Sequence, residues 1–278
     1  MRSGSLLLFA VLLLGIASPA MPQNSRNKAP LEVTYIANEG FLIAVGSSKV
    51  MIDALHNNPW GYQSTPDEAL EAMIAGQPPF DGVDLLIASH DHADHFNARW
   101  VHRYLLHQPD VVFVSSERAV NALEDSAGAE YGRIQSQVLN VNPQWGGCDE
   151  LAVDGIRARF LTLNHADESN ERFLTLGSLV TILGRKILHL ADMAPQTTTA
   201  FLEGYGLAGE GIDVAFVDNF FALDETGRRL LRDHIRPKHI VLMHIRPDEV
   251  EQIREQARQI FPDAVVFDAP LQRRTFDR

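Results

Sequence analysis

The chain has 278 residues, 45% of them hydrophobic, and a formal net charge of -12. This apolar content is enough to bury one large core or two small ones. Because like charges repel, the acidic balance disfavours binding to nucleic acids or anionic membranes, and we expect neither partner. The densest basic groups read as solvated faces or tail residues: Arg228, Arg229 and Arg232, and Arg273 with Arg274.

The first thirty residues differ in composition from the rest. Arg2 precedes an apolar run from Leu6 to Ile16, and Ser18-Pro19-Ala20 offers a cleavage site, so residues 1–20 are typical of a secretory signal peptide. The run is too short for a stable transmembrane helix, although an uncleaved anchor remains an alternative. We therefore expect an exported protein, periplasmic or secreted, with no stable membrane insertion after cleavage. Residues 21–30 predict a flexible lead-in, and residues 31–278 a single domain.

The single cysteine limits the redox chemistry of the chain. With Cys148 alone, no internal disulfide can form. No histidine stands beside it in the sequence to activate a thiolate, so we expect a packed and inert residue.

The first half of the mature chain begins with short strands and continues with alternating helices and strands. β-rich runs at 31–37, 41–45 and 49–52 are separated by turn residues and predict an antiparallel meander. A helix at 65–75 and a strand buried on both faces at 83–89 follow. The pattern then predicts a helix at 97–106, a strand at 111–115 and a helix at 117–125.

The second half repeats this order. β-rich segments at 138–141, 151–163, 176–183 and 186–191 precede strands at 214–217, 239–244 and 264–267, with helices at 224–234 and 248–261 between them. A β-meander followed by β/α units, twice over, predicts an α/β (α+β) fold. We expect two sheets face to face with helices on the outer sides, a four-layer αββα sandwich.

One segment carries the densest set of metal-binding side chains. Residues 89–95 read Ser-His-Asp-His-Ala-Asp-His and directly follow the buried strand. In extended backbone, residues two apart project to the same side, so His90 and His92 can share one ion, and after a turn Asp94 and His95 can hold a second. Imidazole and carboxylate suit Zn²⁺ and also accept Mn²⁺ or Fe²⁺. A solvated histidine-rich loop is the alternative, but α/β proteins usually bind ligands at such strand ends.

Three further candidate ligands, His165, Asp192 and His244, each follow an apolar strand. Taken singly, each could cap a turn or bond the backbone. Together with residues 90–95 they form an ordered set that resembles the metallo-β-lactamase superfamily over residues 31–270. Segments 39–43 and 236–244 are most similar to the branch that contains the ascorbate-phosphate lactonase and related hydrolases.

The resemblance implies a metal-dependent hydrolase with a dinuclear site. His90, His92 and His165 would bind one divalent ion, Asp94, His95 and His244 the other, with Asp192 bridging. Two such ions, Zn²⁺ in the first place, lower the pKa of bound water, so that a bridging hydroxide can attack an ester, lactone, amide or phosphodiester bond of a small molecule. Asp94 could also accept or donate the proton, which would make Asp94 and Asp192 the catalytic pair. The oligomeric state is left open.

Other residues are assigned around this site. Asp53 ends the third strand and would hydrogen-bond loop N–H groups or ligand imidazoles, with an ordinary turn aspartate as the alternative. His189 is expected to be packed or backbone-bonded. For the substrate, Phe220 and Phe221 could line an apolar pocket and Arg172 could clamp an anion, although core packing and a surface salt bridge explain them equally well. The remaining histidines are read as structural: His56, His102, His107, His234 and His239.

Two features separate the functional alternatives. Antibiotic-hydrolysing relatives lack an acidic bridge at the position of Asp192, which disfavours a β-lactam specialist. The lactonase-like branch usually has a glycine-rich stretch after the strand at 214–217, whereas residues 218–223 here read Asp-Asn-Phe-Phe-Ala-Leu, which puts phosphate recognition in doubt. A β-lactamase-type amide hydrolase and a non-catalytic metal-binding module remain alternatives. The second is disfavoured because a structural ion is usually closed by four ligands.

Overall fold

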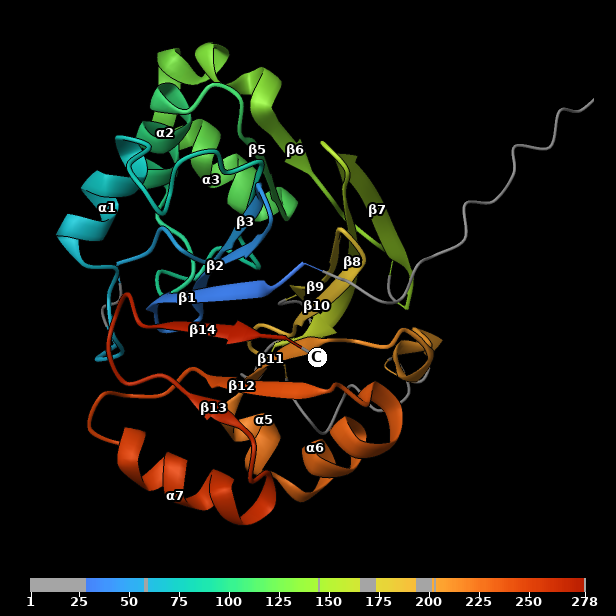
Figure 1. Cartoon of the computed structure of the whole chain (residues 1–278). Helices are drawn as coiled ribbons and strands as arrows, with labels where there is room; N and C mark the ends of the chain where they lie inside the picture. The colour runs from blue at the N-terminus through green and yellow to red at the C-terminus, as the bar shows by residue number, and fades with distance from the viewer. Residues whose placement is uncertain are drawn as a thin grey trace, which may run out of the picture.

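The computed structural model describes residues 29–277 apart from 58–59, 145, 166–173, 194–201 and 203 (Figure 1). The predicted signal peptide, most of the lead-in and Arg172 lie outside these ranges. None of the described helices is long and apolar enough to cross a membrane. Two seven-stranded sheets form the centre of the molecule.

The first sheet has the order β14-β1-β2-β3-β4-β5-β6. Its antiparallel part is made by β1 (Leu31–Ala37), β2 (Gly40–Val45), β3 (Ser48–Ile52) and β14 (Arg273–Phe276). Its parallel part continues from β3 through β4 (Leu85–Ile87), β5 (Val112–Ser115) and β6 (Val138–Asn140). On its outer side lie α1 (Asp67–Ile74), α2 (Ala98–His107) and α3 (Glu117–Ala127), followed by the 3-10 turns η1 (Gly128–Arg133) and η2 (Gln135–Gln137).

The second sheet has the order β13-β12-β11-β10-β9-β8-β7. An antiparallel meander is made by β7 (Cys148–Val153), β8 (Ile156–Asn164), β9 (Leu174–Ile182) and β10 (Arg185–His189). Parallel strands follow as β11 (Val214–Asp218), β12 (His239–Met243) and β13 (Val265–Val266). The outer helices are α5 (Asn219–Leu223), α6 (Glu225–Leu230), the π-helical η4 (Leu231–Ile235) and α7 (Val250–Ile260), with η3 (Leu207–Gly209) preceding β11.

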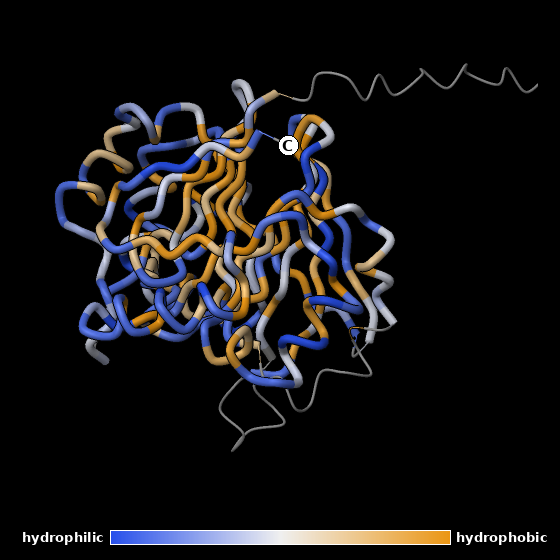
Figure 2. The backbone as a smooth tube through the Cα atoms, turned by 60° about the horizontal axis from the view of Figure 1, so that its bottom comes forward, coloured by the Kyte–Doolittle hydropathy of each residue, from blue (hydrophilic) through white to orange (hydrophobic). Residues whose placement is uncertain are grey.

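Three apolar clusters separate the layers and hold them together. The central one lies between the sheets, where the rings of Phe41 and Phe216 are 4.4 Å apart. A second cluster joins the first sheet to α1–α3 through residues such as Phe113, and a third joins the other sheet to α5–α7 through residues such as Leu230. In Figure 2, the strands in the interior of the molecule are coloured mainly as hydrophobic residues. Three cores between four layers confirm the predicted αββα sandwich.

The structure departs from the predicted elements in local detail. The run at 151–163 is a hairpin, β7–β8, because Asp154 and Gly155 adopt positive φ angles of 45° and 83° and reverse the chain. The helix predicted at 224–234 begins as expected, where the side chain of Asp224 accepts from Thr226 and Gly227, but it continues as a π-helix from Leu231, and α5 before it was not predicted. The predicted tail at 273–276 is instead an edge strand, and Cys148 is exposed rather than packed.

Candidate metal centre

The histidine-rich loop begins directly after β4 and is fixed at its start. The backbone N–H and the hydroxyl of Ser89 each donate to Asp53, at 2.7 Å in both cases. The loop then turns, because the N–H groups of His95 and Phe96 donate to the carbonyl of His92 at 3.1 and 2.9 Å. This turn directs the two halves of the motif toward neighbouring positions, as the spacing predicted.

A first group of side chains collects His90, His92, His165 and Asp192, whose ligand atoms all lie within 4.8 Å of one another. Asp192 Oδ2 is 3.2 Å from His165 Nε2 and 3.9 Å from His90 Nε2. All but the half-buried His92 are buried. Three imidazoles and one carboxylate oxygen are a donor set that can hold a divalent cation.

A second group contains Asp94, His95 and His244 and shares Asp192 with the first. Asp94 Oδ2 lies 3.4 Å from His244 Nε2 and 3.7 Å from His95 Nε2. The other oxygen of Asp192, Oδ1, lies 3.2 Å from His95 Nε2 and 3.6 Å from His244 Nδ1. Asp192 therefore presents one carboxylate oxygen to each group, and the fold brings all seven predicted ligands together.

Strained backbone gathers around the same strand ends. Asn38, Asp53, Ala191 and His244, which follow β1, β3, β10 and β12, have φ angles between 46° and 56°. A non-glycine residue in this region costs about 1–3 kcal/mol and persists only where its surroundings impose it. The fold therefore maintains an unfavourable backbone conformation at the strand ends that border the cluster.

Two buried aspartates orient the histidines of the second group. Asp53 Oδ2 is 2.9 Å from His95 Nδ1, and Asp218 Oδ2 is 2.9 Å from His244 Nδ1. A carboxylate that accepts the Nδ1 proton fixes the tautomer and leaves Nε2 with its lone pair. Asp53 thus has the contacts predicted for it, both to the loop and to an imidazole.

Sequence reasoning missed Asp218 and Glu39. Asp218 ends β11 and is the register partner of Met243, which directly precedes His244. An acidic residue at the end of an apolar strand between two ligand-bearing strands was the signal that could have found it. Glu39 is 0% exposed in the turn between β1 and β2. Its only signal was an acidic residue in the turn of an apolar hairpin.

Burial and neighbouring charges divide the histidines into two kinds. Burial holds the pKa of His90 well below its usual range, so His90 is neutral. Burial, the largest single influence, acts in the same direction on His95 and His244, but Asp192 and the other carboxylates around them together outweigh it and raise both pKa values well above the usual range. Burial alone would raise the pKa of Asp192, yet His244 and His95 hold it well below its usual range. Asp192 is therefore ionised.

Unsatisfied polar atoms test whether the cluster fits a cation. His95 Nε2, His244 Nε2 and Asp192 Oδ1 are buried and form no hydrogen bond within the described part of the chain. Leaving such atoms unsatisfied costs about 1–3 kcal/mol each. His95 Nε2 lies 3.2 Å from Asp192 Oδ1, and His244 Nε2 lies 3.4 Å from Asp94 Oδ2, so a cation bound among these side chains would satisfy them. The residues present therefore fit a bound metal.

Two other buried histidines are accounted for by backbone contacts. His189 Nε2 is 3.1 Å from the carbonyl of Glu39, and its Nδ1 accepts from the N–H of Ala191 at 3.2 Å. His56 Nε2 is 3.2 Å from the carbonyl of Ala37, and burial lowers its pKa to about 4. Both contacts agree with a structural role.

Aromatic residues border the cluster. Phe220 is 55% exposed, and its ring is edge-on to His244 at 6.0 Å. Tyr62 stacks on His244 at 4.3 Å, and Trp60 is 6.1 Å from His92. Phe221, by contrast, is 0% exposed in the third core. Phe220 is therefore accessible for the expected substrate contact, whereas Phe221 packs in the core and does not line a substrate pocket.

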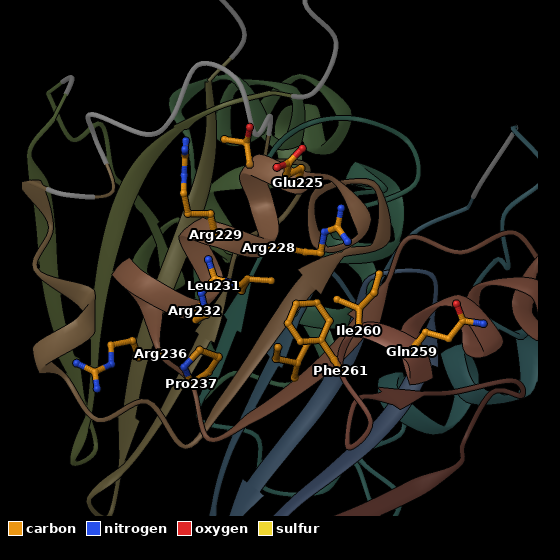
Figure 3. Close-up of a pocket in the computed structure, with 12 residues that line it drawn as sticks. Glu225, Arg228, Arg229, Leu231, Arg232, Arg236, Pro237, Gln259, Ile260 and Phe261 are labelled. Carbon is orange, nitrogen blue, oxygen red and sulfur yellow. The ribbon is translucent and has the colours of Figure 1, made fainter.

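A large pocket lies on a different surface. It has a volume of about 940 Å³ beside α6, η4 and α7, and none of its lining residues belongs to the cluster. Phe261, Ile260 and Pro237 lie at its centre in Figure 3, with arginine side chains spread around them. Arg229 and Arg232 are exposed there, in agreement with a solvated face.

These features define a class of protein: an αββα sandwich with a buried His/Asp cluster at the ends of its strands. The family model described as "Beta-lactamase superfamily domain" matches residues 48–266. The chain belongs to this superfamily and is a metal-dependent hydrolase of the metallo-β-lactamase fold. A sequence comparison with curated proteins found no significant match.

Solved structures show the same fold at low identity. Igni18, a metallo hydrolase from Ignicoccus hospitalis, is 16% identical, with 90% of this chain and 100% of that chain covered and a TM-score of 0.57. YhfI from Bacillus subtilis is 14% identical, with 89% and 100% covered and a TM-score of 0.59. An isothiocyanate hydrolase from Delia radicum gut bacteria is also 14% identical, with 89% and 100% covered and a TM-score of 0.57.

Proposed function

We propose that this chain is an exported dinuclear hydrolase that cleaves the acyl C–O or C–N bond of an ester, lactone or amide in small molecules with an apolar group. The observation that carries the dinuclear assignment is Asp192, whose two oxygens lie 3.2 Å from His165 and from His95, one in each group. Export is supported by the composition of residues 1–20.

The reaction requires a proton acceptor beside the cations. Two divalent cations held here would supply an activated water molecule and positive charge for the oxygen of the scissile bond. Asp94 Oδ2 faces His244 and accepts from Asn38 Nδ2 at 3.5 Å, whereas Oδ1 has no hydrogen-bond partner among the described residues. Asp94 Oδ1 can therefore take a proton and return it to the leaving group.

The surroundings of the cluster support an apolar substrate. Trp60 and Phe220 are 51% and 55% exposed, and with Tyr62 they bring three rings next to His92 and His244. Exposed aromatic rings at a polar site can hold an apolar substituent beside the bond to be cleaved. The likeness of segments 39–43 and 236–244 to the lactonase branch favours an ester or lactone. Residues 218–223 lack the glycine-rich stretch of that branch, which disfavours a phosphate group.

The test is a substrate panel on metal-free protein reloaded with Zn²⁺ or Mn²⁺. It contains aromatic and acetyl esters, a lactone, a β-lactam, a phosphodiester and, because of the structural neighbour, an aromatic isothiocyanate. We expect the aromatic ester or lactone to be the best substrate and Asp192→Ala to abolish turnover with the fold intact. Asp91→Asn is the matched control, because Asp91 lies in the same loop but pairs with Arg118 at 3.0 Å.

Two results would contradict the proposal. Unchanged turnover in Asp192→Ala would remove the bridging role. Protein that binds two ions but hydrolyses none of the substrates with either metal would instead be a metal-binding module.

A further inference from the structure

The turn between β1 and β2 brings an acidic side chain beneath the second group. Gly40 permits this close approach, because a Cβ atom at that position would lie 2.6 Å from the carbonyl oxygen of Asp53. On the other side, His189 Nε2 is 3.1 Å from the carbonyl of Glu39. The turn is thus held between the ends of β3 and β10, and Glu39 is 0% exposed.

The carboxylate of Glu39 lies against the two histidines of the second group. Oε2 is 3.6 Å from His95 Nδ1, and Oε1 is 3.4 Å from His244 Nδ1. Ligand atoms of Glu39, His95, Asp192 and His244 all lie within 4.8 Å of one another. Glu39 is therefore as close to these side chains as they are to each other.

Within the described ranges, the two imidazoles of His95 and His244 are the only basic groups paired with this buried carboxylate. Each imidazole offers one Nδ1 proton, and Asp53 and Asp218 already lie 2.9 Å from these two atoms. Both oxygens of Glu39 lack a hydrogen-bond partner, and no lysine or arginine forms an ion pair with it among the described residues. Burying this carboxyl group as an anion beside Asp192 is costly, so a proton or a further cation has to compensate it, and a cation here would also satisfy the ligand atoms of His95 and Asp192 that lack partners.

We propose that Glu39 is a further acidic ligand of the second cation and shifts the preference of this position toward Mn²⁺, relative to the histidine-rich first position. The inference rests on the proposed dinuclear site. The first group offers three imidazoles and the carboxylate of Asp192. With Glu39, the second offers three carboxylates, those of Glu39, Asp94 and Asp192, and two imidazoles. Carboxylate oxygens suit Mn²⁺, whereas imidazole nitrogens suit Zn²⁺, so the two positions differ in metal preference.

The test measures metal binding without substrate. Metal-free wild type, Glu39→Gln and Glu39→Asp are titrated with Mn²⁺, followed by electron paramagnetic resonance, and with Zn²⁺ against a chromophoric chelator. We expect Glu39→Gln to keep the first ion and bind the second Mn²⁺ at least tenfold more weakly, with a smaller loss for Zn²⁺. Glu39→Asp should be intermediate. Glu32→Gln, an exposed residue of the same hairpin, should bind as wild type does.

The outcomes separate this inference from the proposed function. Equal affinity of wild type and folded Glu39→Gln for the second Mn²⁺ overturns the role of Glu39 and leaves the dinuclear site standing. Fewer than two ions bound by wild type overturns the dinuclear site itself. Circular dichroism checks folding, and if Glu39→Gln does not fold, unchanged Mn²⁺ affinity in Glu39→Asp overturns the inference.

Discussion

Replacing Asp218 by asparagine tests how the second group is held. Asp218 is 1% exposed, its Oδ2 lies 2.9 Å from His244 Nδ1, and its Oδ1 accepts from the N–H of Phe220 at 2.6 Å. Asparagine keeps the shape but removes the charge that fixes the imidazole. Loss of such a partner weakens metal binding by about 10–100-fold. This corresponds to about 1.4–2.8 kcal/mol of binding free energy.

The effect should fall on one ion only. In a competitive titration with a chromophoric chelator, Asp218→Asn should release its second ion at lower chelator concentration, while the first is retained. At saturating metal, the free energy of unfolding should fall by the same roughly 1.4–2.8 kcal/mol, because ligand-linked stability follows the dissociation constant. Asp91→Asn is again the control. Wild-type affinity for both ions in Asp218→Asn would refute the orienting role.

Three further predictions concern the whole site. Chelation should lower Tm, because Asp94 and Asp192 then lack a compensating cation; an unchanged Tm in calorimetry would contradict a bound metal. The pKa values of His95 and His244 are raised above 6.5, so protonation of these two histidines stabilises the metal-free fold, and this stabilisation is lost as the pH rises through the raised pKa values. Below the raised pKa values, protons on the same two histidines compete with cations for the site. Metal affinity in chelator titrations should therefore increase with pH across this range, and a flat profile would contradict it. Phe220→Ala should raise KM for aromatic esters roughly 3–10-fold and leave KM for acetyl esters unchanged. The control Leu183→Ala, at another exposed residue, should leave both KM values unchanged. Equal KM changes for both esters in Phe220→Ala would exclude a substrate contact.

The layers of the fold could be predicted because the strands that form them are visible in the sequence as apolar runs. β1 to β3 and β10 to β12 are apolar runs bounded by turn residues, and each was found within two residues of its ends. β14 was missed because its residues 273–275 are exposed and only Phe276 is buried. The short helix α5 was missed because its five residues are too few to show a helical apolar period, whereas the start of α6 at Asp224 was predicted.

The ligands could be predicted because each follows an apolar strand, and parallel strands bring their carboxyl ends to one edge. Partners of those ligands were harder to find. Glu39 has the same residue type as many surface acids and is distinguished mainly by its burial, whereas Asp218 is also marked by its place at the end of an apolar strand between two ligand-bearing strands. Phe220 and Phe221 are neighbours on α5, where consecutive side chains diverge by about 100°, so only one can face the cluster. Composition alone does not decide which.

The site joins the two halves of the chain, so metal binding and sheet packing form one equilibrium. The loop at 90–95 extends from the first sheet, whereas Asp192 and His244 extend from the second. The sheets meet beside the site, where the N–H of Leu176 donates to the carbonyl of Ser89 at 2.9 Å. Neither half holds a complete donor set alone, because each group needs Asp192 from the second sheet and histidines from the first. Cations that bind only the assembled cluster therefore stabilise the interface between the sheets, which explains why the fold tolerates five buried carboxyl groups there, those of Glu39, Asp53, Asp94, Asp192 and Asp218.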